Sequence, residues 1–233
     1  MIAGCLNAKG RFMELYDVMR TAFAAREFTD QPVSDELISH ILEQARFAPS
    51  GGNRQGWKVL VVREQSSRLR LRELIEPQMR RYVAQVKAGE APLNTINPSQ
   101  VSDAEIAETP VPGQMLDNLT GAPVILLVFV DLSVVASFDS HLDRVGVISG
   151  ASIYPFVWNI LLAARNEGLG GTLTTFAAGA ETEVKAHFGV PDEMAFAAMI
   201  PMGKPVKQLT KLKRNPVADF VSKEYWNGET LID

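Results

Sequence analysis

The sequence predicts a protein of mixed α and β structure with one hydrophobic core. Three apolar segments have the length and composition of strands, and segments with apolar residues three and four positions apart, typical of helices, lie between them. The chain has 233 residues, of which 46% are hydrophobic and 21% charged, and this suits one domain or two small ones. Because no repeat or clean boundary is found, we expect a single domain over residues 13–233.

The composition argues against several classes of protein. The formal net charge is −4 without a basic block, which argues against a nucleic-acid partner. A single cysteine, Cys5, excludes an intrachain disulfide framework. Residues 1–11 lack a signal-peptide pattern, and the longest apolar run, Pro123–Val130, is too short to cross a bilayer. We therefore expect a soluble, cytoplasmic protein without a membrane partner.

The first third of the chain is predicted to hold two helices and a strand. Residues 1–12 are weakly patterned and are predicted to form a flexible extension before a short helix that ends near residue 22. Ser34 is expected to cap a second helix, which Pro49 cannot continue. Trp57–Val62 then has the pattern of a buried strand.

The polar loop between that second helix and that strand is the first candidate binding element. Its glycines at 51 and 52 permit backbone angles closed to other residues and let a ligand approach the main chain. Ser50, Asn53 and Gln55 add short hydrogen-bonding groups. The pattern suits the edge of a planar ligand with a polar rim, although by itself it also fits a simple helix stop and turn.

The middle of the chain is predicted to contain a long charged helix and an insertion. Residues 66–88 carry many arginines, which we interpret as a solvated face balanced by Glu73 and Glu76 and not as a phosphate site. Residues 89–114 have little periodicity and are predicted to form a lid or the wall of a substrate pocket. Pro123–Val130 is apolar throughout, which predicts a central strand covered on both faces.

The second half begins with a polar cluster and the most apolar helix. Asp139, His141 and Asp143 could ligate a metal, but without further partners we interpret them as polar packing at a helix start. Residues 146–168 are apolar on several faces, which fits an intersubunit core, and Pro155 predicts a break in the first part. Gly168–Gly171 follows a helix and not a strand, so it is no dinucleotide-binding fingerprint.

The remaining segments are shorter. Residues 172–176 are predicted to be extended, 181–188 to form a surface helix, and 194–200 to form a buried strand that Pro201 ends. The tail after the basic stretch 207–214 is too apolar around Tyr225 and Trp226 to remain free in solution. None of the conventional catalytic arrangements stands out, which is consistent with an enzyme whose cofactor carries the chemistry.

Two phrases give the chain its resemblance to a known family. Phe28-Thr29-Asp30-Gln31-Pro32-Val33, followed by Arg46 to Trp57 with Pro49-Ser50-Gly51-Gly52-Asn53 inside it, resembles the nitroreductase family of FMN-dependent oxidoreductases. The resemblance continues more weakly through residues 161–171 and 214–216. It implies an α+β fold with a mostly antiparallel central sheet flanked by helices. It also implies an intertwined homodimer in which the C-terminal segment wraps the partner subunit.

The resemblance further implies a cofactor, a reaction and a set of site residues. FMN would accept hydride from NADH or NADPH and pass electrons, through flavin N5, to nitroaromatics, quinones or similar electron-poor acceptors, with no catalytic side chain. Arg214 would pair with the phosphate. The implied contacts to the flavin ring are Pro49, Ser50, Gly51 and Asn53 across the dimer interface, Gln55 nearby, and the backbone amides around Thr174 and Thr175 at the N5 edge.

The phosphate-binding stretch departs from the family pattern. Where the family has Arg-Arg-Ser-x-Arg, this chain has Ala22-Phe23-Ala24-Ala25-Arg26, so that only Arg26 keeps its place. Arg20, Lys211 or Lys213 could replace the missing cations. This departure leaves two alternatives open: a specialised member, such as an enone reductase, a reductive dehalogenase or a flavin-degrading enzyme, and a weakly active flavin-binding dimer.

Overall fold

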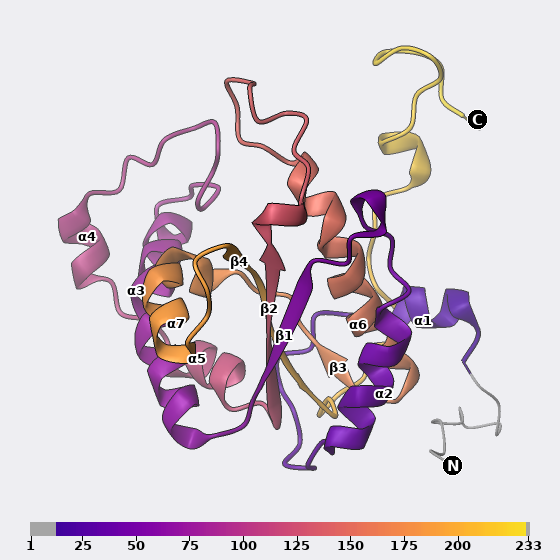
Figure 1. Ribbon diagram of the computed structural model, residues 1–233. Helices are drawn as coiled ribbons and strands as arrows, with labels where there is room; N and C mark the ends of the chain where they lie inside the picture. Colours follow the sequence, from indigo (N-terminus) through magenta and orange to yellow (C-terminus); the bar gives the residue numbers. More distant parts are fainter. Residues whose placement is uncertain (1–12, 232–233) are drawn as a thin grey trace.

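The protein has three layers, with a sheet between two groups of helices (Figure 1). The computed structural model describes residues 13–231, so the predicted extension over residues 1–12 lies outside the described residues. The sheet has the order β1-β2-β4-β3 and every neighbouring pair is antiparallel. The strands are β1 (Trp57–Val62), β2 (Val124–Asp131), β3 (Gly170–Gly171) and β4 (Met194–Gly203). The predicted α+β class with an antiparallel sheet is confirmed.

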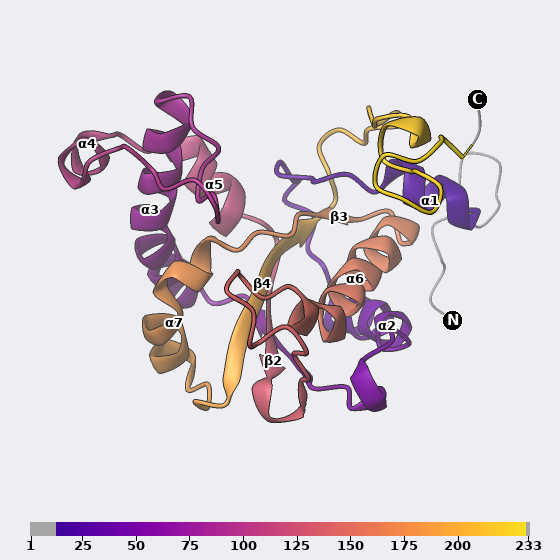
Figure 2. The same ribbon diagram turned by 90° about the horizontal axis from the view of Figure 1, so that it is seen from above.

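Strand β2 divides the core because its side chains alternate between the two faces of the sheet. Leu126 and Val128 pack on one face, and Leu127 and Phe129 pack on the other. The first face is covered by α2 (Asp35–Ala45) and α6 (Tyr154–Asn166), with α1 (Leu15–Thr21) beside α6. The second face is covered by α3 (Gln65–Lys87), α5 (Gly113–Thr120) and α7 (Glu181–Phe188). Figure 2 shows the same two groups from above.

Several predicted boundaries are confirmed. The Ser34 hydroxyl oxygen accepts a hydrogen bond from the Leu37 N–H and caps α2. The predicted break near Pro155 is present, because a 3₁₀ segment, η3 (Ile148–Ser152), precedes α6 and the proline lies in the first turn of that helix. Gly168 adopts a φ of 76° just after α6, in the left-handed region that glycine tolerates best.

Two of the strand predictions need correction. Strand β1 lies at the edge of the sheet and is half-buried, whereas its apolar run predicted a buried strand. Strand β4 does not end at Pro201 but continues to Gly203. The proline opposes Ile125, and its carbonyl accepts a hydrogen bond from the Thr172 N–H. That bond keeps the strand paired although the proline itself has no N–H to donate.

Residues 89–114 contain more regular structure than the sequence pattern predicted. They include α4 (Asp103–Glu108), which begins with a reciprocal capping box between Ser102 and Glu105. Helix α5 also begins within this segment, at Gly113. The segment leaves the body of the molecule next to α3 and returns to it (Figure 1).

The polar cluster after β2 organises a loop and not a helix start. The Asp139 carboxylate is buried and accepts hydrogen bonds from the Val147 N–H at 2.8 Å, from Arg144 at 2.8 Å and from the Ser137 hydroxyl at 2.9 Å. These donors, led by the Val147 N–H, hold the pKa of Asp139 far below its usual range. Within residues 13–231, no group of three His, Cys, Asp or Glu side chains is placed to hold a metal ion.

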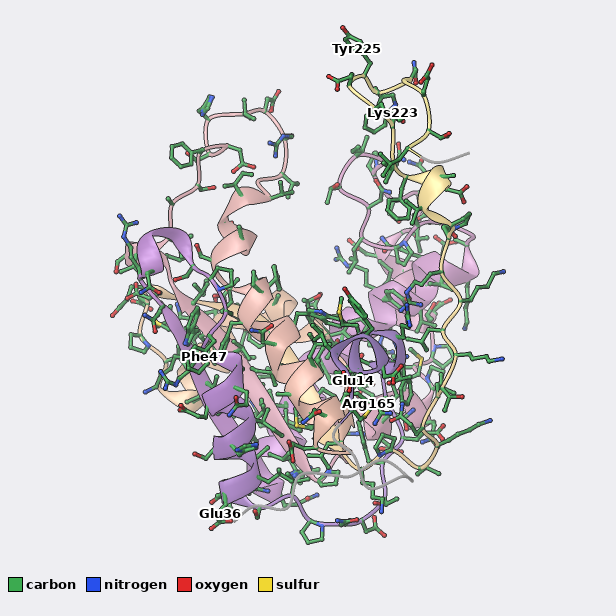
Figure 3. The ribbon with its side chains drawn as sticks, turned by 90° about the vertical axis from the view of Figure 1, so that its right-hand side faces the viewer. Glu14, Glu36, Phe47, Arg165, Lys223 and Tyr225 are labelled. Carbon is green, nitrogen blue, oxygen red and sulfur yellow. The ribbon has the colours of Figure 1, made fainter. Side chains whose placement is uncertain are left out.

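The C-terminal segment extends away from the layered body (Figure 1). Lys223 and Tyr225 lie at its far end in Figure 3. Phe220, Tyr225 and Trp226 are exposed, with 94% of Trp226 accessible to solvent. Among the described helices, none is long and apolar enough to cross a membrane.

Candidate functional site

A cavity of about 310 Å³ opens where the end of α1, the end of α6, strand β3 and the tail meet. Residues 22–26 run beside β3, since the Ala25 N–H donates to the Gly171 carbonyl at 3.1 Å. Most of the wall is apolar, and two alanines and two glycines are among its residues. The cavity is lined by Ala22, Phe23, Ala24, Arg26, Trp158, Leu161, Arg165, Gly170, Gly171, Thr172, Leu173, Gln208 and Arg214.

Three arginines from distant parts of the chain converge on this first cavity. Arg26 follows α1, Arg165 lies in the last turn of α6, and Arg214 lies in the tail. Arg26 donates to the Ala24 carbonyl and Arg214 to the Lys213 carbonyl. Within the part of the chain that the structure describes, no carboxylate forms an ion pair with Arg26 or Arg214. Their positive charge is therefore available to an anion.

Arg165 lines this cavity, and the sequence analysis did not identify it as a candidate. It is the one basic residue in the last turn of an otherwise apolar helix, and such a position also suits the helix dipole. A charge at the end of a helix that is apolar on several faces is a signal that could have identified it. The predicted Arg20 instead lies outside the cavity, on α1, with its guanidinium over the Tyr16 ring. Its role at a phosphate stays a prediction.

A second cavity of about 610 Å³ adjoins the first and shares Arg26, Thr172 and Leu173 with it. Aromatic residues form part of its wall, with Tyr82 of α3 edge-on to Phe176 at 5.5 Å between ring centroids. The remaining lining residues are Gln78, Pro92, Leu93, Leu119, Thr174, Thr175, Ala178 and Gly179. The segment predicted to form a pocket wall thus contributes Pro92 and Leu93 to this cavity.

The backbone of residues 174 and 175 offers one free donor and not two. The Thr174 N–H donates to the Met199 carbonyl at 3.0 Å and continues the sheet, so it is not available to a ligand. For the Thr175 N–H, no acceptor is found among residues 13–231. Of the two amides predicted at this edge, only the Thr175 N–H therefore lacks a protein acceptor among residues 13–231, and Thr175 lines the second cavity.

The polar loop after α2 is held in a defined shape. The Gly51 N–H donates to the Ser152 hydroxyl at 3.1 Å, and the Gln55 N–H donates to the Ser50 hydroxyl at 3.0 Å. The Gln55 side-chain amide donates to the Asn53 side chain at 3.2 Å. Asn53 and Gln55 have φ angles of 54° and 52°, in the left-handed region that side chains rarely adopt. Strained residues of this kind cluster at functional sites.

Within one chain, this loop and the two cavities are separate. None of Pro49, Ser50, Gly51, Asn53 and Gln55 lines either cavity, whereas Arg26, Arg214, Thr174 and Thr175 line one or both. Figure 2 shows α6 between the end of α2, where the loop begins, and β3. The loop itself is exposed. Within one chain, the loop therefore does not contribute to the wall of either cavity.

The comparisons with known proteins agree with this architecture. The sequence model of the nitroreductase family matches residues 20–204. The chain is 24% identical to the iodotyrosine deiodinase of Hydra vulgaris over 216 residues, which cover 91% of this chain and 74% of that protein. It is 24% identical to iodotyrosine deiodinase 1 of Homo sapiens over 209 residues, which cover 89% of this chain and 67% of that protein.

Solved structures share the fold. Oxidized iodotyrosine deiodinase bound to FMN and 3-iodo-L-tyrosine superposes with a TM-score of 0.63 at 23% identity, covering 88% of this chain and 96% of that one. A BluB-like flavoprotein from Clostridium difficile 630 gives a TM-score of 0.67 at 22% identity, and the match covers 90% of this chain and 98% of that one. An FMN and NADPH-dependent nitroreductase from a Sphingopyxis strain gives a TM-score of 0.64 at 20% identity, and the match covers 91% of this chain and 99% of that one.

Proposed function

Since this chain belongs to the nitroreductase family of FMN-dependent oxidoreductases, we propose that it uses FMN to pass electrons from NADH or NADPH to small electron-poor acceptors, such as nitroaromatics or quinones. The observation that carries the proposal is the convergence of Arg26 and Arg214 on a cavity that adjoins a second, larger one. A phosphorylated flavin has an anionic end and a planar ring, and the two cavities offer one site for each.

The residues present fit FMN chemically. Guanidinium groups bind phosphate through paired, charge-assisted hydrogen bonds, which suits Arg26 and Arg214. The Thr175 N–H is an unpaired donor at the wall of the larger cavity, where it would hydrogen-bond the polar edge of the ring. Bound FMN would supply the redox chemistry, and no side chain would need to act as an acid. The protein would bind, orient and desolvate the reactants.

The proposal includes a homodimer, because the exposed loop at residues 49–55 needs a partner's cavity. Large apolar side chains are exposed on α1, on α6 with the segment before it, and in the tail, and burying them would favour association. They include Leu15, Tyr16, Val147, Ile148, Tyr154, Trp158, Phe220, Tyr225 and Trp226. Sedimentation of the purified protein should give a dimer, and deletion of residues 216–233 should weaken it. The cytoplasmic location expected from the sequence remains a prediction.

The loop can be tested directly. Replacement of Ser50 and Asn53 by alanine should reduce flavin retention without unfolding the protein, since both residues are exposed or half-buried. Alanine substitutions at Glu73 and Asp103, on the surfaces of α3 and α4, provide a matched control. Unchanged flavin content in the double variant would remove the loop from the site.

A second candidate function is reductive dehalogenation of a halogenated aromatic compound. It is favoured by the similarity to iodotyrosine deiodinases, one of them solved with FMN and 3-iodo-L-tyrosine. The segment over residues 89–114, which contributes Pro92 and Leu93 to the larger cavity, would then act as a lid over the aromatic ring. Anaerobic incubation of the reduced protein with 3-iodotyrosine and with a nitroaromatic compound separates the two, because only dehalogenation releases iodide.

The experiment that tests the proposal as a whole is the visible absorption spectrum of the purified protein. A flavin spectrum that bleaches on anaerobic addition of NADPH or NADH is the expected result, and it identifies the donor. A protein that binds FMN but is bleached by neither nucleotide would instead be a flavin-binding dimer with little turnover. A protein that neither contains nor takes up FMN would refute the proposal.

A further inference from the structure

Helix α3 holds two walls of the second cavity in place. Gln78 and Gln85 lie two helical turns apart, so their side chains point to the same side of the helix. The Gln78 side-chain amide donates to the Gly179 carbonyl at 3.1 Å, and Gly179 belongs to one wall of the cavity. The Gln85 Oε1 accepts a hydrogen bond from the Leu93 N–H at 2.9 Å, and Leu93 belongs to another wall. Both walls are therefore fixed to the same helix.

Leu93 has a backbone conformation that leucine rarely adopts. Its φ of 54° lies in the left-handed region, where a side chain is strained. Gln85 is buried and fixes the turn at a second point, because its carbonyl accepts a hydrogen bond from the Glu90 N–H at 3.0 Å. The Leu93 side chain is nevertheless 54% exposed, and it lines the cavity. A strained backbone that presents an apolar side chain to a cavity indicates contact with a ligand and not a role in the core.

The segment beyond Leu93 is closed by its own hydrogen bonds. The Glu90 carboxylate accepts a hydrogen bond from the Ser99 hydroxyl at 2.6 Å and another from the Gln100 N–H at 2.7 Å. These bonds join the two ends of the loop that contains Leu93. Leu93 therefore lies on a preformed rim of the cavity.

The walls around Leu93 carry little charge. Among the described residues that line the second cavity, Arg26 alone has a charged side chain and none is a carboxylate. Arg26 also lines the first cavity, where it would bind the phosphate of FMN. An ammonium group on a ligand would lose water in the second cavity without finding a carboxylate to pair with, and this costs free energy.

We propose that Leu93 is a specificity-determining residue of the acceptor site, which makes the site prefer uncharged aromatic acceptors, and that Gln85 is its positioning residue. The inference rests on the proposed function, in which the acceptor lies in the second cavity. Tyr82 and Phe176 line the same cavity, and an apolar leucine beside them suits an aromatic ring. Nitroaromatic compounds without charged groups meet this description, whereas 3-iodotyrosine carries an ammonium group.

The test compares two ligands of similar shape. 4-Nitrobenzyl alcohol is uncharged, whereas 4-nitrobenzylamine carries an ammonium group at pH 7. The dissociation constant of each is measured from the change in flavin absorption of the oxidised, FMN-loaded protein, so that no turnover is needed. The wild-type protein should bind the alcohol at least about tenfold more tightly than the amine.

Leu93→Ala tests the residue itself. The alcohol should bind about fivefold to tenfold more weakly, because most of the apolar contact is removed. The amine should bind with an unchanged dissociation constant, because the lost contact is offset by water that reaches the ammonium group. FMN affinity and thermal unfolding should not change. Ile96→Ala is the matched control, since Ile96 lies in the same segment, is 85% exposed and does not line the cavity.

Gln85→Met tests the positioning role. It leaves the Leu93 N–H without its acceptor and should weaken binding of the alcohol as Leu93→Ala does. Added to Leu93→Ala, it should have no further effect on the alcohol, whereas a merely structural role of Gln85 would add to the loss. Leu93→Ala changes an exposed side chain and decides the proposal even if Gln85→Met fails to fold.

The outcomes separate this inference from the proposed function. A wild-type protein that does not take up FMN would refute the proposed function itself. An FMN-loaded wild-type protein that binds the alcohol and the amine equally, or binds neither, would overturn only the present inference. A preference for the alcohol that is unchanged in Leu93→Ala would do the same.

Discussion

Two groups of arginines in this protein differ in what they contact. On α3, Arg70, Arg72 and Arg80 each pair with a carboxylate, at distances of 2.9, 2.6 and 2.8 Å. At the first cavity, Arg26 and Arg214 have no carboxylate partner within residues 13–231. The arginine-rich segment of the sequence is therefore a structural surface, and the scattered arginines form the candidate binding site. The two groups differ in whether a carboxylate pairs with each arginine, and not in how many arginines lie close together in the sequence.

The largest expected effect is on stability and concerns Arg68, a further partly buried arginine of α3 that contacts backbone carbonyls and not a carboxylate. Its guanidinium donates to the carbonyls of Thr120, Ala122 and Pro123, which join α5 to β2, and burial lowers its pKa. Arg68→Met leaves these acceptors without donors, so we expect a loss of roughly 2–4 kcal/mol in the free energy of unfolding. Urea denaturation measures it. FMN affinity should be unchanged. A loss of FMN binding without a loss of stability would contradict the separation of the arginines of α3, which stabilise the fold, from those at the cavity, which would bind the ligand.

The next largest effect concerns the cavity group and should appear in binding alone. Arg214→Gln removes a charge that only the proposed phosphate uses, so the FMN dissociation constant should rise by about tenfold to a hundredfold. The midpoint of urea unfolding without flavin should stay the same, because Arg214 is exposed and, among residues 13–231, donates to the adjacent Lys213 carbonyl alone. Lys213→Gln is the neighbouring control, since Lys213 does not line the cavity. Equal effects of the two substitutions would indicate a general electrostatic effect.

The sequence predicts the fold better than the site because the two depend on different ranges of interaction. Local periodicity is enough to locate α2, α3 and α7, and the apolar run of β2 is enough to place it at the centre of the sheet. The edge position of β1 depends on which strands pair, and its apolar run does not contain that information. The capping box of α4 was present in the sequence but lay inside a segment with little periodicity.

The site residues required information that only the folded chain holds. Arg26, Arg165 and Arg214 are far apart in the sequence and meet because α1, α6 and the tail come together. Family resemblance identified Arg26 and Arg214, whereas the only sequence signal for Arg165 was its place as the basic residue in the last turn of an apolar helix. Arg20 lies close to the missing arginines in sequence, but its helical position directs it towards Tyr16. Proximity along the chain was therefore a poor guide to the cavity.

Asp139 is a carboxylate whose charge, unlike that of Arg26 and Arg214, is satisfied by donors within the protein. Because hydrogen bonds lower the pKa of Asp139 in the folded state, its contribution to stability is present above the usual carboxyl pKa and is lost as the pH falls through the lower, folded value. Stability should therefore not vary through Asp139 between about pH 5 and 8, and this contribution should decline below about pH 4. Asp139→Asn should be less stable at neutral pH and should lack this part of the decline. Thermal unfolding across the pH range measures the stability of the variant and of the wild type. If stability declined equally in both proteins as the pH fell, Asp139 would be excluded as the source of the decline.

The smallest effect is expected for an exposed ion pair of α3. Arg72 reaches Asp117 of α5 at 2.6 Å, but the Asp117 side chain is 62% exposed. Water screens such a pair and two long side chains lose freedom to form it, so Arg72→Gln should cost about 0–1 kcal/mol. A double-mutant cycle with Asp117→Asn isolates the pair, and its coupling should shrink further in high salt because exposed charges are screened. A coupling energy as large as the effect of Arg68→Met would mean that solvent exposure does not determine how much each arginine of α3 contributes to stability. Burial could then no longer explain why Arg68 contributes more to the fold than Arg72.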